Sequence, residues 1–160
     1  MQGVNTFVEM DRTIYPPLIR EFYSNFQCKN EVFLTMIKGK FIVLNEELLM
    51  EVGGFKCFEY QYGTFERKMM NSFEPVNVYR SLLRNIDHCD ARSKPHATSL
   101  AVEYRLMYIL IAYSLVPRDA DHDNPTTEDL RLMSAIKEGM KINWPLVVLL
   151  TMLYIASSSS

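Results

Sequence analysis

The acidic stretch DADHDNPTTED contains the residue types that come nearest to a metal site. Asp119, Asp121 and Asp123 have the D-x-D-x-D spacing that begins a calcium-binding EF-hand loop. Such a loop also needs glycine at its sixth position and a bidentate glutamate at its twelfth, where this chain has Asn124 and Leu130. The stretch therefore predicts a solvated acidic loop before a helix, where negative charge is favourable, and no metal ion.

A metal-dependent nuclease or transposase needs carboxylates that converge on two divalent ions. The carboxylates of this chain lie mostly in polar connectors, and none follows a strand in an alternating strand–helix pattern. We therefore expect no catalytic residue and no enzymatic activity, and we keep the metal-dependent nuclease as the least favoured alternative. The carboxylates considered are Asp87, Asp90, Asp119, Asp121, Asp123 and Glu128.

Histidines and cysteines give no second site. His88, Cys89 and His96 lack a further ligand pair at the spacing of structural zinc. With Cys28 and Cys57 there are three cysteines, and none forms a CxxC pair. The composition predicts reduced thiols in an intracellular protein, cytoplasmic or nuclear, without a cofactor. The N-terminus has no basic region followed by an apolar run, so we expect no signal peptide.

A small basic patch is the feature that favours nucleic acid. Lys38 and Lys40 flank Gly39, and Arg20 and Arg12 could extend the patch. The chain has 17 basic and 19 acidic residues, so it lacks the broad positive field that steers DNA binding. Lysines at a hairpin tip also keep an edge soluble. Nucleic-acid binding through Arg20, Lys38 and Lys40 is therefore an alternative that is possible but not favoured.

Hydrophobic periodicity predicts a mainly α fold with one β-hairpin packed on the helices. The hairpin spans residues 32–44 around Gly39, and Asn45 and Asn143 are expected to cap the helices that follow them. Asn124 and Pro125 are expected to begin another helix. The predicted helices cover residues 16–26, 46–52, 74–86, 100–116, 125–140 and 144–156.

The domain organisation follows from the same pattern. We expect a frayed N-terminus over residues 1–13, one helical domain over residues 14–156 and a serine tail over residues 157–160. A chain of 160 residues suits a single domain. Residues 55–73 are aromatic without a sustained period and receive no assignment.

Four motifs occur in the order of a known family. The stretches YPPLIREFYSNF, MIKGKFIVLNEELLMEVGGF, YSLVP and LRLMSAIKEGMKINWPLVV together resemble the plant transposon protein domain, a retrotransposon-associated plant family. The match covers roughly residues 14–155, with lysine where the family's hairpin usually has arginine. The matching residues are Leu18, Ile19, Arg20, Glu21, Phe22, Tyr23, Asn25, Lys38, Gly39, Lys40, Ile42, Leu115, Pro117, Ile136, Gly139, Ile142 and Asn143.

The resemblance implies a transposon-derived plant domain. The name of the family refers to its frequent position within or beside retrotransposon-derived reading frames, and not to a transposase reaction. It favours a non-catalytic role through protein–protein contacts, with a nucleic-acid-binding accessory of a mobile element as the alternative. Members usually continue with more helix and a basic stretch, whereas this chain stops in Ser157–Ser160. We therefore expect a C-terminal truncation that leaves the last helix partly uncovered.

The last helix decides the expected partner. Residues 144–156 carry no charge, but this stretch is shorter than the roughly 18–20 residues that span a bilayer, so we expect a core helix and no transmembrane span. A helix apolar all round must be buried on more than one side. We therefore expect self-association or a protein partner on this helix. The predicted interaction surface comprises Leu146, Leu149, Leu150, Leu153 and Tyr154.

Overall fold

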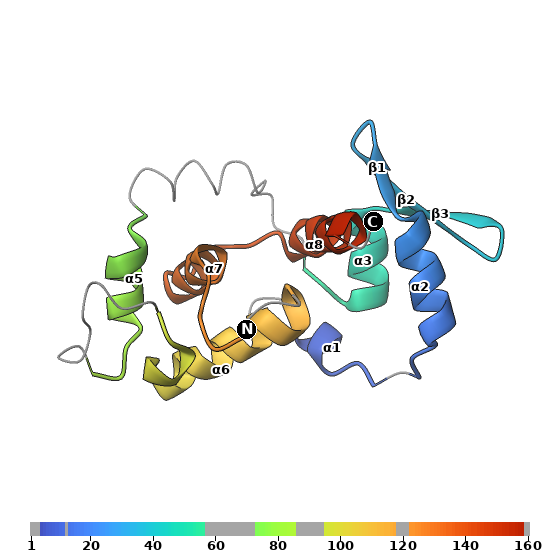
Figure 1. Ribbon diagram of the computed structural model, residues 1–160. Coiled ribbons are helices and arrows are strands. Elements are labelled where there is room, and N and C mark those ends of the chain that lie inside the picture. Colours follow the sequence, from blue (N-terminus) through green and yellow to red (C-terminus); the bar gives the residue numbers. More distant parts are fainter. Residues whose placement is uncertain (1–3, 12, 57–72, 86–94, 118–121, 159–160) are drawn as a thin grey trace. The chain divides into compact units, whose positions relative to one another are not determined.

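The computed structural model describes residues 4–11, 13–56, 73–85, 95–117 and 122–158. These residues form seven α-helices and one three-stranded antiparallel sheet, which confirms the predicted mainly α class (Figure 1). The chain divides into two compact units, one from residues 1–59 and 143–160 and the other from residues 60–142. Two such units are compatible with one domain or with two, so the single domain over residues 14–156 stays a prediction.

The first unit begins with a short helix where a frayed N-terminus was expected. Helix α1 (Asn5–Val8) follows Val4, which is buried. The ring of Phe7 packs on that of Phe55 with 4.7 Å between their centroids. The structure differs from the expectation here because these contacts come from distant residues, which local periodicity does not report.

Helix α2 (Pro16–Asn25) begins at the two prolines, as predicted, and lies against the sheet (Figure 1). Proline suits the first turn because its missing N–H would have no partner there. The hydroxyl of Thr35 donates to the carbonyl of Phe22 at 2.7 Å, and the amide of Asn25 donates to the carbonyl of Met36 at 3.1 Å. These bonds fix α2 on one face of the sheet.

The sheet contains the predicted hairpin and one strand more. Strands β2 (Val32–Ile37) and β3 (Lys40–Leu44) join through Lys38 and Gly39, both at positive φ, which is the geometry of a type I′ turn. Strand β1 (Gln27–Lys29) pairs with β2 through a second two-residue turn, Asn30 and Glu31, also at positive φ. Glutamate rarely adopts this conformation, so the sequence carried only a weak signal for β1.

Helices α3 (Glu46–Gly53) and α8 (Trp144–Ser158) complete the first unit. The side chain of Asn45 accepts from the backbone N–H of Leu48 at 2.8 Å, and that of Asn143 accepts from the N–H of Leu146 at 3.2 Å. Both predicted caps are confirmed. Helix α8 continues through two residues of the expected serine tail. The core cluster joins α2, the sheet, α3 and α8, and consists of Phe26, Leu44 and Leu149 with Phe22, Phe33, Leu48, Leu49, Met152, Leu153 and Ala156 around them.

The second unit contains α5 (Pro75–Ser81), a 3-10 turn η2 (Ala97–Ser99), α6 (Val102–Leu110), a π-helical turn η3 (Ile111–Leu115) and α7 (Thr127–Lys137). Helix α5 ends earlier than predicted. Leu82 is fully buried after its end, and Leu83 forms a β-bridge with Leu100. This pairing takes the chain out of the helix, although the apolar period continues.

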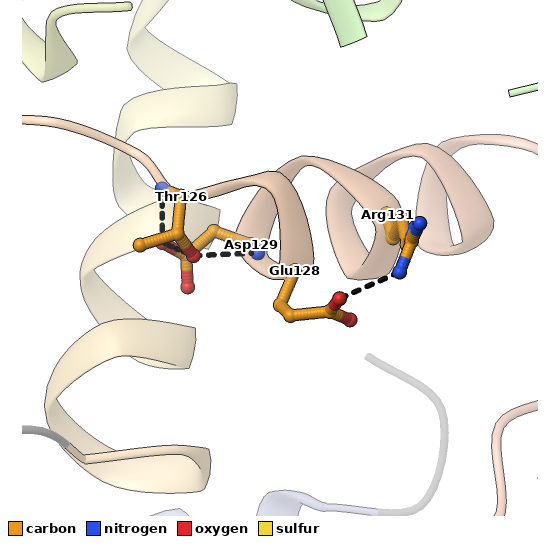
Figure 2. A network of polar contacts seen from close by, with 4 residues as sticks. All are labelled: Thr126, Glu128, Asp129 and Arg131. Carbon is orange, nitrogen blue, oxygen red and sulfur yellow. Dashed lines mark hydrogen bonds and ion pairs between the residues drawn. The ribbon is translucent and has the colours of Figure 1, made fainter. Parts of the chain in front are cut away.

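Helix α7 is capped two residues later than the sequence predicts. Thr126, rather than Asn124, is the N-cap, and it forms a capping box with Asp129 (Figure 2). The N–H of Thr126 donates to the Asp129 carboxylate at 2.7 Å, and the N–H of Asp129 donates to the Thr126 hydroxyl at 3.2 Å. Asp129 is buried, so the reciprocal pair satisfies polar groups that have no access to water.

Candidate functional site

His96 and Glu128, two of the candidates for chemistry, have structural roles, and the backbone carbonyl of a third, Asp123, accepts from the N–H of Ala97 at 2.8 Å. His96 caps η2, because its Nδ1 accepts from the N–H of Thr98 at 3.3 Å. Glu128 forms an ion pair with Arg131 at 2.6 Å on the surface of α7 (Figure 2). Within the described residues, no three His, Cys, Asp or Glu side chains come together as a metal site. The other candidates, Asp87, His88, Cys89, Asp90, Asp119 and Asp121, lie outside the described residues.

The predicted basic patch is divided by an acid. Lys38 and Lys40 are exposed at the hairpin turn, and the carboxylate of Glu21 accepts from the backbone N–H of Lys38 at 2.7 Å. Arg20, the neighbour of Glu21 on α2, lines a pocket beside α8. The structure therefore places a negative charge at the turn and does not gather the predicted cations there. Arg12 lies outside the described residues.

The predicted surface on α8 is partly used inside the first unit. Leu149 is 1% exposed in the core cluster, and Leu146 and Leu153 are half-buried. Leu150 and Tyr154 are exposed. Leu149 offers no surface to a partner, which corrects the prediction for that residue. The reason is that α2, the sheet and α3 fold back on α8 and supply the cover that the sequence pattern left unassigned.

A pocket of about 310 Å³ lies between α2 and the end of α8. Polar and apolar surface contribute almost equally to its wall, with Tyr23 and Arg20 as its larger polar groups. Burial raises the pKa of the Tyr23 phenol. The volume is at the lower end of the range for small-molecule sites.

The outer face of the sheet, opposite α2, carries several apolar side chains. Side chains alternate between the two faces of a strand, and residues directly opposite each other in a pair share a face. Phe33 and Leu44 form one such pair and belong to the core. The register then places the alternate residues on the other face. On β2 and β3 this outer face consists of Val32, Leu34, Met36, Phe41 and Val43, and β1 adds Gln27 and Lys29, opposite Leu34 and Val32.

The exposure of this face is high for apolar side chains. Phe41 is 75% exposed, Val43 is 56% exposed and Val32 is 42% exposed. Antiparallel sheets with one solvated face normally carry polar residues on it. An exposed contiguous apolar patch usually marks an interaction site. Lys29, Lys38 and Lys40 are exposed at the two turns that border the face.

Sequence reasoning missed this face, although a signal was present. VFLTMI and KFIVL are nearly continuous apolar runs rather than alternating ones. Continuous runs are typical of strands that are covered on both faces. The prediction that the hairpin packs on the helices leaves its second face without an assignment.

A second apolar stripe lies on α6 in the other unit. Val102, Leu106, Ile109 and Tyr113 follow one another at helical spacing and are 64%, 63%, 43% and 57% exposed. The ring of Tyr113 stacks on His122 with 4.3 Å between the centroids. The exposed Glu103 and Arg105 lie on the same helix.

Neither the helices nor the comparisons with known proteins point to a further site in the described part of the chain. None of the described helices combines the length and the hydropathy that crossing a bilayer requires. The comparisons with known proteins add no relative: no protein-family model matches the chain, and no curated protein or solved structure matches it either.

Proposed function

We propose that this chain is a non-catalytic protein-interaction module and that the outer face of its sheet is the contact surface. The observation that carries the proposal is the exposure of Phe41 at 75% in a face of five apolar side chains. Aromatic residues in the centre of an apolar patch are the usual anchors of protein interfaces. Burying exposed apolar surface of this kind against a partner contributes a free energy of about 25 cal/mol per Å².

The wider role proposed is that of a transposon-derived plant domain in an intracellular compartment, cytoplasmic or nuclear. Its support is the order of the four sequence motifs, from YPPLIREFYSNF to LRLMSAIKEGMKINWPLVV, together with the unpaired cysteine Cys28. This part of the proposal is independent of the contact surface, because the sheet face could serve any host pathway.

The test is capture of partners from plant extract by tagged wild-type protein, after nuclease treatment. Phe41→Glu and Val43→Glu should reduce the capture of a given partner at least about tenfold, because each places a charge in a desolvated contact. Val52→Glu is the matched control, since Val52 is an equally exposed valine at 62% on α3, away from the sheet face. It should leave capture unchanged.

Two results would contradict the proposal. Loss of the captured partners after nuclease treatment would show that nucleic acid, and not a protein contact, mediates the binding. Capture that Phe41→Glu and Val52→Glu reduce equally would show that the sheet face is not the contact surface.

A further inference from the structure

Among the described strands, β3 is an edge of the sheet, with β2 on one side only. The two-residue turn closes on the pair Ile37–Lys40, and hydrogen-bonded and non-hydrogen-bonded pairs alternate along an antiparallel ladder. The pairs made by Lys40, Ile42 and Leu44 are therefore the hydrogen-bonded ones, and the backbone N–H and C=O groups of these residues point toward β2. The backbone N–H and C=O groups of Phe41 and Val43 point away from β2, toward the open edge. An edge of this kind is a template for another strand.

We propose that the strand that pairs with this edge is β3 of a second copy of the chain, antiparallel and centred on Ile42. This inference rests on the proposed function, because edge pairing joins the contact surfaces of two copies into one. The two-fold register places Phe41 opposite Val43 of the second copy, and Val43 opposite Phe41. The outward-facing backbone groups of both residues then meet their counterparts in two hydrogen-bonded pairs. A self-complementary contact of this kind closes as a dimer.

The same register joins the two apolar faces. Directly opposite residues share a face, so Phe41 of one copy lies beside Val43 of the other on the outer side. Aromatic and β-branched side chains form favourable cross-strand pairs. Each contact is made twice, and the dimer gains a continuous apolar surface across two sheets.

Charge selects the antiparallel direction. Lys38 lies in the turn before β3, Lys40 is the first residue of the strand, and Glu46 and Glu47 lie just after it, in the first turn of α3. Antiparallel pairing about Ile42 aligns Lys38 of each copy with Glu46 of the other and brings the basic end of each strand to the acidic end of its partner. Parallel pairing would bring like charges together. Lysines at a strand edge normally discourage pairing, and here this effect excludes the parallel arrangement while leaving the antiparallel one favourable.

The first experiment tests the edge with Val43→Pro. Proline removes the N–H that points to the open edge and leaves the bonds to β2, so the folded monomer should persist. We expect the wild type to sediment as a dimer at micromolar concentration and Val43→Pro to raise the dimer dissociation constant about a hundredfold or more. Thermal unfolding of the variant, monitored by circular dichroism, shows whether the fold is intact.

The second experiment tests the charges and does not depend on the proline. Lys38→Glu and Glu47→Lys should each weaken the dimer about tenfold, because Lys38 of one copy lies beside the first turn of α3 of the other and each change turns an attraction into a repulsion twice per dimer. The double variant Lys38→Glu/Glu47→Lys should recover most of the affinity that each single variant loses. A double variant that is weaker than both single variants would overturn the antiparallel register.

The outcomes separate this inference from the proposed function. A wild type that is monomeric at micromolar concentration would overturn self-pairing, while Phe41-dependent capture of another protein would still support the contact surface. A dimer that resists Val43→Pro but is lost with Val32→Glu would mean stacking face to face; it would overturn edge pairing and support the face. A dimer insensitive to both substitutions would overturn the inference.

Discussion

Gly54 has two separate reasons to be glycine. It ends α3 with φ of 64°, a left-handed conformation that residues with a Cβ rarely adopt. A Cβ at this position would also lie 2.5 Å from the Cβ of Thr6 on α1. The close approach therefore ties the end of α3 to the N-terminal helix. Sequence reasoning predicts the helix end from the glycine pair, but it has no means of predicting the contact with Thr6.

Gly54→Ala should lower the free energy of unfolding by about 3 kcal/mol, because left-handed strain and a steric clash add. Gly139→Ala is the matched control, since Gly139 has φ of 69° with no heavy atom near its Cβ position. It should cost about 1 kcal/mol, from strain alone. Urea denaturation of both variants measures the difference. Equal losses would show that the contact with Thr6 is not maintained in solution.

At the scale of elements, Asn143 joins two helices of the first unit. Its side-chain oxygen caps α8 at the N–H of Leu146, and its amide group donates to the carboxylate of Glu46 on α3 at 2.9 Å. Asn143 is 6% exposed, so both bonds are shielded from water. A single amide thus serves as a cap and as the link between helices that are distant in sequence.

Asn143→Ala should destabilise the chain by about 2–3 kcal/mol, because a cap and a hydrogen bond to a carboxylate are lost together. Asn45→Ala removes a cap alone and should cost about 1 kcal/mol. A double-mutant cycle of Asn143→Ala with Glu46→Ala isolates the link between the helices. A coupling energy near zero in that cycle would contradict the described contact.

Elements that depend on local signals were predictable. The caps Asn45 and Asn143 and the turn at Gly39 use residues whose own chemistry determines the geometry. Strand β1 and the cover of α8 depend on contacts between segments distant in sequence, so periodicity alone does not contain them. The candidate surface could not be predicted for a related reason. A continuous apolar run in a strand predicts burial on both faces, and only the structure shows that the face with Phe41 and Val43 is exposed.

At the scale of the molecule, charge argues against nucleic acid as the main partner. The net charge is −2, and Glu21 contacts the turn that carries Lys38 and Lys40. Nucleic-acid affinity comes largely from the number of phosphates that clustered cations neutralise. Nucleic-acid binding, the alternative function predicted from the sequence, therefore stays a prediction with little support from the described surface.

We expect no submicromolar binding of duplex DNA at physiological salt, measured by fluorescence anisotropy. Lys38→Glu/Lys40→Glu should leave the signal unchanged. Submicromolar, salt-sensitive binding by the wild type that this double variant weakens, with a salt slope smaller by about two units, would make nucleic-acid binding the leading function.

The discontinuity of the first unit has a consequence for synthesis. Residues 60–142 form a contiguous unit, whereas the unit around Phe26 and Leu44 is completed by α8, which leaves the ribosome later. Domains fold as units during translation, and exposed apolar surface in the meantime invites aggregation. The core of the N-terminal segment therefore stays incomplete and exposed to solvent until Leu149 has been synthesised. We expect the second unit to fold first and the first unit to be the part that depends on chaperones.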